Sequence, residues 1–300
     1  MLRSGQIIFE LYQLNTLKRG RGNILPKNFN ELLKAQWHKG NFVCVGLDSD
    51  YLKIPASMRK ATIAESIYYF NCQIIDATKK LVCAYKPNIA FYEAHGGDGL
   101  FALHQTIGYI NLVAPEVPVI LDAKRADIDN TNLGYIKAAF DWLNADAITV
   151  HPYLGSEALK PFLDLKDKGI IVLCKTSNKG AGEFQDLMVV KSNNHKTPLY
   201  QYVAKKISTT WNANGNCALV VGATYPEELK AVRELVGDMP ILLPGIGAQG
   251  AEIKATVENG QNSKGQGMII NSSRGIIFAD DPRAETQKLH NQINLYRSIK

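Results

Sequence analysis

The stretch VILDAKRADIDNT, residues 119–131, begins as a short apolar run and ends in closely spaced charges. The strand signal begins two residues earlier, at residue 117. The run VPVILDAK (117–124) has the composition of a buried strand, because apolar and β-branched side chains dominate it. Asp122 and Lys124 are two residues apart, so their side chains project to the same face of an extended strand. Asp127 follows three residues later, where we expect the strand to turn into a helix. The stretch therefore predicts a buried strand that delivers charged groups at its carboxyl end.

Seven similar apolar runs occur along the rest of the chain, and longer segments with helical patterning separate them. We predict eight strands, at residues 41–48, 81–88, 117–124, 146–153, 169–178, 217–224, 239–247 and 267–273. We predict helices at about 28–39, 57–79, 98–113, 130–144, 155–167, 197–213, 226–236, 250–260 and 281–297. Eight strand–helix units in about 260 residues match a (β/α)8 barrel, the TIM-barrel architecture of the α/β class. A doubly wound open sheet fits less well, because no GxGxxG motif follows the first strand.

Length and composition limit the class of protein. The 300 residues are 46% hydrophobic and 21% charged, which excludes a disordered, collagen-like or coiled-coil chain. No apolar stretch approaches the roughly 18 residues that would suggest a membrane span. Residues 28–300 contain no evident linker, so we expect a single domain there. Residues 1–27 form a basic N-terminal extension, which we expect to be a surface arm or disordered.

The charge balance and the cysteines indicate the partners and the compartment. The net charge is +6, but the basic residues do not cluster beyond KRGRG (18–22) and do not interleave with aromatic residues, so we expect no nucleic-acid partner. The five cysteines form no CxxC pair and four lie in apolar runs, which favours free thiols in the cytoplasm. The six histidines are scattered, and the sequence predicts no metal site.

Polar residues recur where the predicted strands end. In a barrel of this kind the active site gathers at the carboxyl ends of the strands. Asp48, Lys86 and the Asp122–Lys124 pair all lie at such ends. A lysine held between carboxylates stays charged, because opposite charges favour the ammonium form, and it can deliver a proton to carbon. The pattern suits a reaction that generates a carbanion and quenches it, and a purely structural ladder of ion pairs is the alternative.

The last two predicted strands indicate a phosphate site. PGIGAQG (244–250) and INSSRG (270–275) each place small residues and polar side chains where a strand meets a helix. Loops after strands seven and eight of a barrel frequently bind phosphate through backbone N–H groups. Gln249, Ser273 and Arg274 are the candidate side chains, and the arginine would add charge-assisted hydrogen bonds. Asp48 and Lys86 then suit sugar hydroxyls, and Ser177 and Asn178 suit an amide-bearing ring.

In these features the chain resembles the orotidine 5′-phosphate decarboxylases, which convert orotidylate to UMP and carbon dioxide. The resemblance extends from about residue 29 to about residue 281, and it includes the subgroup signatures KPNxAFYE and KTSN. The motifs that carry it are VGLD (45–48), AYKPNIAFYE (84–93), LDAKRADIDNT (121–131), CKTSN (174–178), PGIGAQG (244–250) and SRG (273–275).

The resemblance implies a role for each site residue. Lys124 would protonate C6 of the pyrimidine, Asp122 would lie beside the substrate carboxylate, and Lys86 would join the charged network near the ribose. Asp127 and Thr131 would reach across the interface of a homodimer into the partner's site. The remaining implied contacts are ribose for Asp48, the pyrimidine amide for Ser177, and phosphate for Gln249 and Arg274. The family uses no metal and no organic cofactor.

Some alternatives stay open at this point. Residues 179–196 could be part of a mobile lid over the pyrimidine or a long surface insertion. A magnesium-dependent sugar-phosphate decarboxylase or aldolase of the same barrel superfamily would share the DxKxxD pattern. A non-catalytic phosphometabolite-binding barrel is a third reading, and the intact Asp122, Lys124 and Asp127 count against it.

Overall fold

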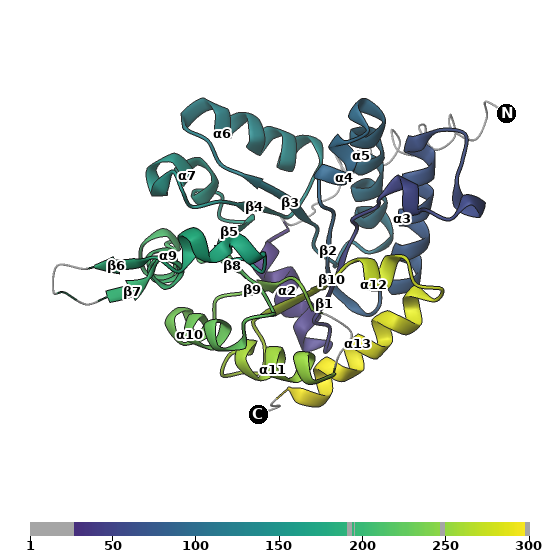
Figure 1. Ribbon diagram of the computed structural model, residues 1–300. Helices are drawn as coiled ribbons and strands as arrows, with labels where there is room; N and C mark the ends of the chain where they lie inside the picture. Colours follow the sequence, from purple (N-terminus) through teal and green to yellow (C-terminus); the bar gives the residue numbers. More distant parts are fainter. Residues whose placement is uncertain (1–26, 191–193, 195, 247–249, 298–300) are drawn as a thin grey trace.

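The computed structural model describes residues 27–190, 194, 196–246 and 250–297. Eight parallel strands surround a central core, and helices cover them on the outside (Figure 1). The strands are β1 (Val43–Gly46), β2 (Val82–Lys86), β3 (Ile120–Arg125), β4 (Ala147–Val150), β5 (Gly169–Lys175), β8 (Cys217–Val221), β9 (Ile241–Leu243) and β10 (Met268–Ser272). All eight predicted strands are confirmed, each shorter than its predicted range.

The strand order closes the sheet into a barrel. Hydrogen-bonded neighbours run β2-β1-β10-β9-β8-β5-β4-β3, which leaves β2 and β3 as the two ends. Parallel bridges between Tyr85 and Val119 and between Asn88 and Asp122 join these ends. The predicted (β/α)8 barrel is therefore confirmed, and all eight strands direct their carboxyl ends to one mouth.

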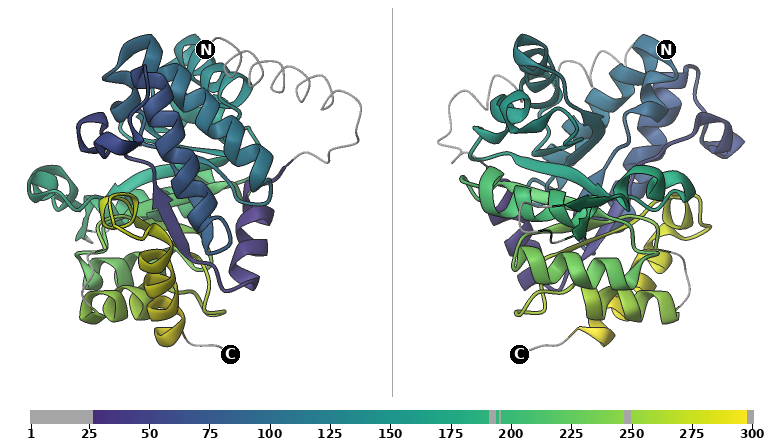
Figure 2. Two further views of the ribbon diagram at one scale, coloured as in Figure 1. Left: turned by 90° about the vertical axis from the view of Figure 1, so that its right-hand side faces the viewer. Right: turned by 60° about the vertical axis from the view of Figure 1, so that its left-hand side comes forward.

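Helices follow the strands along the chain, and Figure 2 shows them packed around the sheet. They are α2 (Phe29–His38), α3 (Ile63–Thr78), α4 (Ala90–Glu93), α5 (Gly96–Val113), α6 (Asp129–Ile136), α7 (Gly155–Leu163), α8 (Gly182–Gln185), α9 (Leu199–Lys206), α10 (Pro226–Val236), α11 (Gly250–Gly260), α12 (Arg274–Ile277) and α13 (Pro282–Tyr296). Two π-helical segments, η3 (Lys137–Trp142) and η5 (Ile207–Trp211), extend α6 and α9, and three short 3₁₀ turns are η1 (Tyr51–Lys53), η2 (Ala56–Met58) and η4 (Lys179–Ala181). Within the described residues, no helix is both long enough and apolar enough to cross a membrane.

The opposite end of the barrel is closed by α2. Its Trp37 is buried and donates from the indole nitrogen to the carbonyl oxygen of Met268, at 2.9 Å. Phe29 packs so tightly against Gly169 that a Cβ atom at this glycine would collide with the phenyl ring. Because this end is sealed by packed side chains, the accessible cavity lies at the carboxyl ends of the strands.

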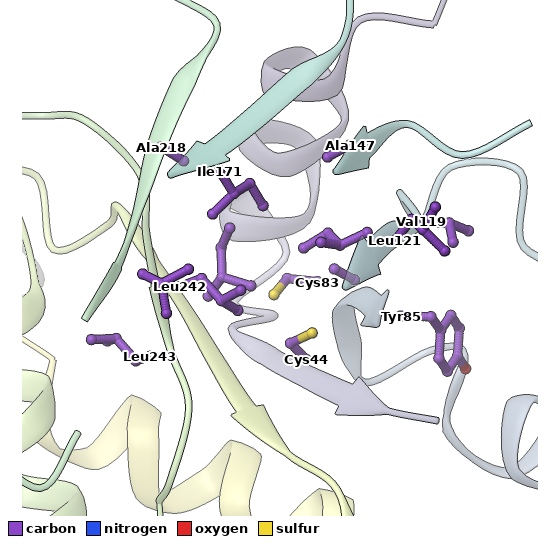
Figure 3. Packing of buried hydrophobic residues seen from close by; sticks show 14 of the residues in the cluster. Cys44, Cys83, Tyr85, Val119, Leu121, Ala147, Ile171, Ala218, Leu242 and Leu243 are labelled. Carbon is purple, nitrogen blue, oxygen red and sulfur yellow. The ribbon is translucent and has the colours of Figure 1, made fainter. Parts of the chain in front are cut away.

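The inside of the barrel is filled with apolar side chains of mixed size (Figure 3). Small residues such as Cys44, Cys83 and Ala218 alternate with the larger Ile171 and Leu242, so that layers of side chains interlock. All five cysteines are free and buried. Burial raises the pKa of the Cys44 thiol to about 12, so it behaves as a small apolar residue rather than a nucleophile.

The predicted helix at 57–79 begins later than expected. Thr62 caps α3, its hydroxyl accepting from the backbone of Glu65 while the Glu65 carboxylate accepts from the backbone of Thr62.

The segment after β5 also differs from a plain loop. It contains α8 and an antiparallel hairpin of β6 (Met188–Val190) and β7 (Lys196–Pro198). Its proposed role as a lid stays a prediction.

Candidate active site

A cavity of about 710 Å³ opens at the carboxyl ends of the strands. It is lined by polar and charged residues from β2, β3 and β10, by the segments that follow β1 and β9, and by residues from α13. The predicted site residues that line it are Asp48, Lys86, Asp122, Ser273 and Arg274. Strand ends that are far apart in sequence thus meet at one mouth, as the barrel requires.

A chain of three charges lies on the β2–β3 side of this cavity. The ammonium group of Lys86 lies 3.0 Å from Asp122 Oδ2, and that of Lys124 lies 2.6 Å from Asp122 Oδ1. Asp48 adds a carboxylate oxygen 3.9 Å from Lys86 Nζ. Lys86 and Asp122 are buried, whereas the Lys124 side chain is about half exposed (48%). One end of this network is therefore fixed in the protein, and the other is open to a ligand.

Thr149, at the end of β4, holds the middle of the network. Its hydroxyl donates to Asp122 Oδ1 at 2.9 Å and accepts from the backbone N–H groups of Ala123 and Lys124, each at 2.9 Å. Lys124 has a φ of +48°, a left-handed conformation that costs a non-glycine residue of order 1–3 kcal/mol. The two hydrogen bonds from Thr149 hold this strained turn in place. Residue 149 falls within the predicted strand 146–153, but the sequence did not indicate this function.

The charges keep each other ionised. Burial opposes the charged form of Asp122, but the ammonium groups of Lys86 and Lys124 outweigh it and lower the pKa of Asp122 to about 2. Burial likewise opposes the charged form of Lys86, yet the carboxylates of Asp122 and Asp48 raise the pKa of Lys86 above its usual value. The site therefore presents an anion between two cations at neutral pH.

The β10 side of the cavity is built differently. Ser273 lies between the end of β10 and the start of α12, and a Cβ atom at Gly46 would collide with its hydroxyl. Gly46 thus opens the space that this serine occupies beside β1. Arg274 is exposed and lines the cavity, and it forms no ion pair with any residue that the structure describes. Gln249 lies outside the described residues, so its phosphate contact stays a prediction.

Ser177 lies near the rim, after the end of β5. It is exposed, and a Cβ atom at Gly245, which lines the cavity, would be 3.6 Å from the Ser177 hydroxyl oxygen. The preceding Lys175 is 2% exposed and forms an ion pair with Asp186 at 2.5 Å. Ser177 therefore stands at the cavity edge on a segment that is tied back to the barrel.

Asp127 and Thr131 lie apart from the cavity of their own chain. Asp127 lies half-buried in the turn between β3 and α6, Thr131 lies exposed in the first turn of α6, and neither is among the residues that line the cavity. Asn132 fixes this turn, its side chain accepting from the Asp127 N–H at 2.8 Å and donating to the Ala158 carbonyl oxygen at 2.6 Å. Their predicted contribution to a neighbouring site stays a prediction.

In the described part of the chain, no group of three or more His, Cys, Asp and Glu side chains is placed to hold a metal ion. The polar lining instead suits an organic anion: the cations of Lys86 and Arg274 line one cavity, and Lys124, which is not among the lining residues, is tied to it through its ion pair with Asp122. Fold and site together define a (β/α)8-barrel protein with a Lys–Asp–Lys charge network at its mouth.

Comparison with known proteins identifies the family. Residues 41–289 match the model of the orotidine 5′-phosphate decarboxylase / HUMPS family. An orotidine 5′-phosphate decarboxylase of Cellvibrio japonicus is 46% identical over 90% of this chain and 100% of its own length, and one from Ralstonia nicotianae is 46% identical over 90% and 99%. The chain therefore belongs to the orotidine 5′-phosphate decarboxylase / HUMPS family.

Solved structures agree with this assignment. The Leishmania donovani OMP decarboxylase has a TM-score of 0.79 and 41% identity, covering 90% of this chain and 98% of that one. The putative orotidine-monophosphate-decarboxylase of Toxoplasma gondii has a TM-score of 0.81 and 39% identity, covering 90% and 96%. The barrel is thus shared with these proteins over about nine tenths of this chain.

Proposed function

We propose that this protein catalyses the decarboxylation of orotidine 5′-phosphate to UMP and carbon dioxide, and that the Lys86–Asp122–Lys124 network carries the reaction. The family match and the curated relatives support a carboxy-lyase with this activity. The single observation that carries the catalytic assignment is the buried carboxylate of Asp122 held between two ammonium groups, at 3.0 and 2.6 Å.

The lining of the cavity orients the nucleotide. Arg274 and Ser273 bind the phosphate, Asp48 and Lys86 bind the ribose, and Ser177 bonds the amide edge of the pyrimidine. The 6-carboxylate is then directed toward Asp122, and C6 toward Lys124, whose side chain is the exposed end of the network. Binding at the distant phosphate supplies the free energy that brings one anion close to another.

The reaction needs charges that are fixed before it begins. The bond between C6 and the carboxylate breaks, carbon dioxide leaves, and the electron pair stays on C6. Lys124 donates a proton to that carbon and recovers one from solvent. Asp122 repels the substrate carboxylate, and the ammonium groups of Lys86 and Lys124 stabilise the charge that develops at C6. Groups already held in place lose little free energy to reorganisation, which makes such preorganised electrostatics effective.

The first test of the activity is an ultraviolet assay of orotidylate consumption. We expect turnover to persist with an added chelator, whereas a magnesium-dependent sugar-phosphate enzyme of the same fold would lose activity. Lys124→Ala should lower kcat by at least about 10³-fold, because it removes the proton donor and a cation. Arg283→Ala, which removes an exposed arginine outside the cavity lining, is the control. Undiminished turnover by Lys124→Ala would overturn the proton-donor assignment.

A homodimer is the second part of the proposal. Asp127 and Thr131 lie beside exposed apolar side chains of α6 and its preceding turn, and the connection before α7, which packs against α6, exposes two more. Those side chains are Ile128 (55% exposed), Leu133 (47%), Tyr153 (87%) and Leu154 (43%). Apolar exposure of this kind marks a protein interface. A second copy covering it would carry Asp127 toward the partner's cavity.

Mixing two inactive variants tests the shared site. Random assembly of Lys124→Ala with Asp127→Ala makes half of the dimers mixed, and each mixed dimer has one intact site of two. Activity should therefore recover to about one quarter of the wild-type value. If the mixture stays as inactive as its components although dimers exchange, Asp127 does not act in the partner's site.

The free cysteines fit the reducing cytoplasm in which we propose that the enzyme works.

A further inference from the structure

Asn271 is a buried polar residue of the cavity lining to which the catalytic assignment gives no role. It lies on β10 beside Cys44 of β1 and is only 6% exposed. Its Nδ2 lies 3.4 Å from the Ser273 hydroxyl, and its Oδ1 has no hydrogen-bond partner in the described structure. A buried carbonyl oxygen without a donor is costly to maintain, and such an atom on a cavity wall points to a bound group that supplies the donor.

The amide lies where β10 meets β1 at the cavity. A Cβ atom at Gly46 on β1 would be 3.1 Å from Asn271 Oδ1 and would collide with the Ser273 side chain, which fills the space beside this glycine. Asp48, two residues beyond Gly46, also has a buried oxygen without a hydrogen-bond partner, and its nearest cation is Lys86 Nζ at 3.9 Å. The two residues that carry these buried acceptors, Asn271 and Asp48, both line the same cavity.

Counting hydrogen-bond donors selects the partner. In its ionised form, orotidine 5′-phosphate cannot donate from its phosphate or its carboxylate. Its donors are the two ribose hydroxyls and the ring N–H, and the ring belongs beside Lys124 and Ser177. A hydroxyl can pair with either end of an amide, so the match holds in both orientations of the Asn271 side chain.

We propose that Asn271 is a substrate-binding residue that positions the nucleotide by hydrogen bonding to a ribose hydroxyl. This inference rests on the proposed function, because it requires a ribonucleotide in the cavity. Its consequence is discrimination: the site should distinguish a ribonucleotide from a deoxyribonucleotide partly through this amide.

The test compares the affinities of several nucleotides for the wild-type protein with their affinities for variants of Asn271. Dissociation constants of UMP, 2′-deoxy-UMP, 3′-deoxy-UMP and uridine are measured by calorimetry for the wild-type protein and for Asn271→Val. Valine suits a strand and cannot form the hydrogen bond. The matched control is Asn41→Val, because Asn41 is also buried but bonds Gln36 and the Lys80 backbone at the other end of the barrel.

In the wild-type protein, removing the contacted hydroxyl should weaken binding roughly tenfold. In Asn271→Val, removing the same hydroxyl should change affinity by less than about twofold, because its partner is already gone. Asn41→Val should keep the full discrimination. If Asn271→Val does not fold, Asn271→Ala gives the same test, since it also removes the amide and should also reduce the discrimination to less than about twofold.

Two results would overturn the inference. Equal losses in the wild-type protein and in Asn271→Val for both deoxynucleotides would show that the amide touches neither hydroxyl. A loss of discrimination between UMP and uridine alone would place the amide on the phosphate. Failure of the wild-type protein to bind UMP would instead contradict the proposed function, and the inference with it, so the two failures are distinguishable.

Discussion

The two sides of the cavity differ in how far their polar groups are already paired. On the β2–β4 side, Lys86, Asp122 and Thr149 are buried and bonded to one another within 3.0 Å. On the β10 side, Arg274 is exposed and Asn271 keeps an unpaired amide oxygen. The difference separates two tasks: chemistry requires charges fixed in advance, whereas binding is completed by groups that the ligand supplies.

We call the β2–β4 side the paired side and the β10 side the unpaired side. The largest effect should come from removing the charge at the centre of the paired side. Asp122→Asn leaves the ammonium group of Lys86 buried with only Asp48 at 3.9 Å. Breaking a buried pair by removing one partner typically costs about 3 kcal/mol or more of unfolding free energy. We also expect kcat to fall by at least about 10³-fold, because the fixed anion and the position of Lys124 are lost together. Chemical denaturation and the ultraviolet assay measure the two effects.

A double variant separates stability from catalysis. Adding Lys86→Met to Asp122→Asn removes the stranded charge, so much of the lost stability should return while activity does not. If the single variant were as stable as the wild-type protein, the network would not be the rigid side of the cavity. If activity returned with stability, the role of Asp122 would be structural only.

An intermediate effect is expected on the unpaired side. Arg274→Gln should lower kcat/KM roughly 100-fold, the value of one or two charge-assisted hydrogen bonds to phosphate. The free energy of unfolding should change by less than about 0.5 kcal/mol, because the side chain is exposed. Arg283→Gln, on the nearby α13, should change neither quantity. A large loss of stability in Arg274→Gln would show that this side is as internally bonded as the other.

For the paired side, the sequence predicted which residues take part but not how they are arranged in space. Asp122 and Lys124 could be identified because charges that end a buried apolar run are conspicuous. The left-handed turn at Lys124 could not, since a φ of +48° at lysine has no signature in composition. The role of Thr149 depends on how β3 pairs with β4, and a register shift between Leu121 and Arg125 brings its hydroxyl beneath the turn. Such contacts arise only when two separate strands are aligned.

On the unpaired side, the glycines and Arg274 indicated phosphate, but Asn271 was not predicted. In the sequence nothing sets Asn271 apart from the other residues of its strand. Only the structure distinguishes it, because the side chain is buried and its amide oxygen has no hydrogen-bond partner. The function of Asp127 was implied by the family resemblance, and a single chain leaves it outside its own cavity. The local sequence pattern thus identifies residues whose function depends only on their own strand end. It does not identify residues whose function depends on a neighbouring strand or a second subunit.

The smallest effect is expected from pH, and it tests whether the paired side stays ionised. The pKa of Asp122 is lowered from 3.8 to about 2, so its contribution to stability is present above its unfolded value and is lost as pH falls through about 2. The pKa of Lys86 is raised from 10.5, so its contribution is present below 10.5 and is lost only as pH rises through the higher folded value. The difference in unfolding free energy between the wild-type protein and Asp122→Asn should therefore stay constant between about pH 5 and pH 7, and shrink below about pH 4. It should also shrink at alkaline pH, because the stranded Lys86 of the variant loses its proton more easily once Asp122 is gone. Taking the difference between the two proteins cancels groups that titrate alike in both. A difference that changed steadily between about pH 5 and pH 7 would show that a member of the network titrates there, and the carboxylate between two ammonium groups would not be the state that meets the substrate.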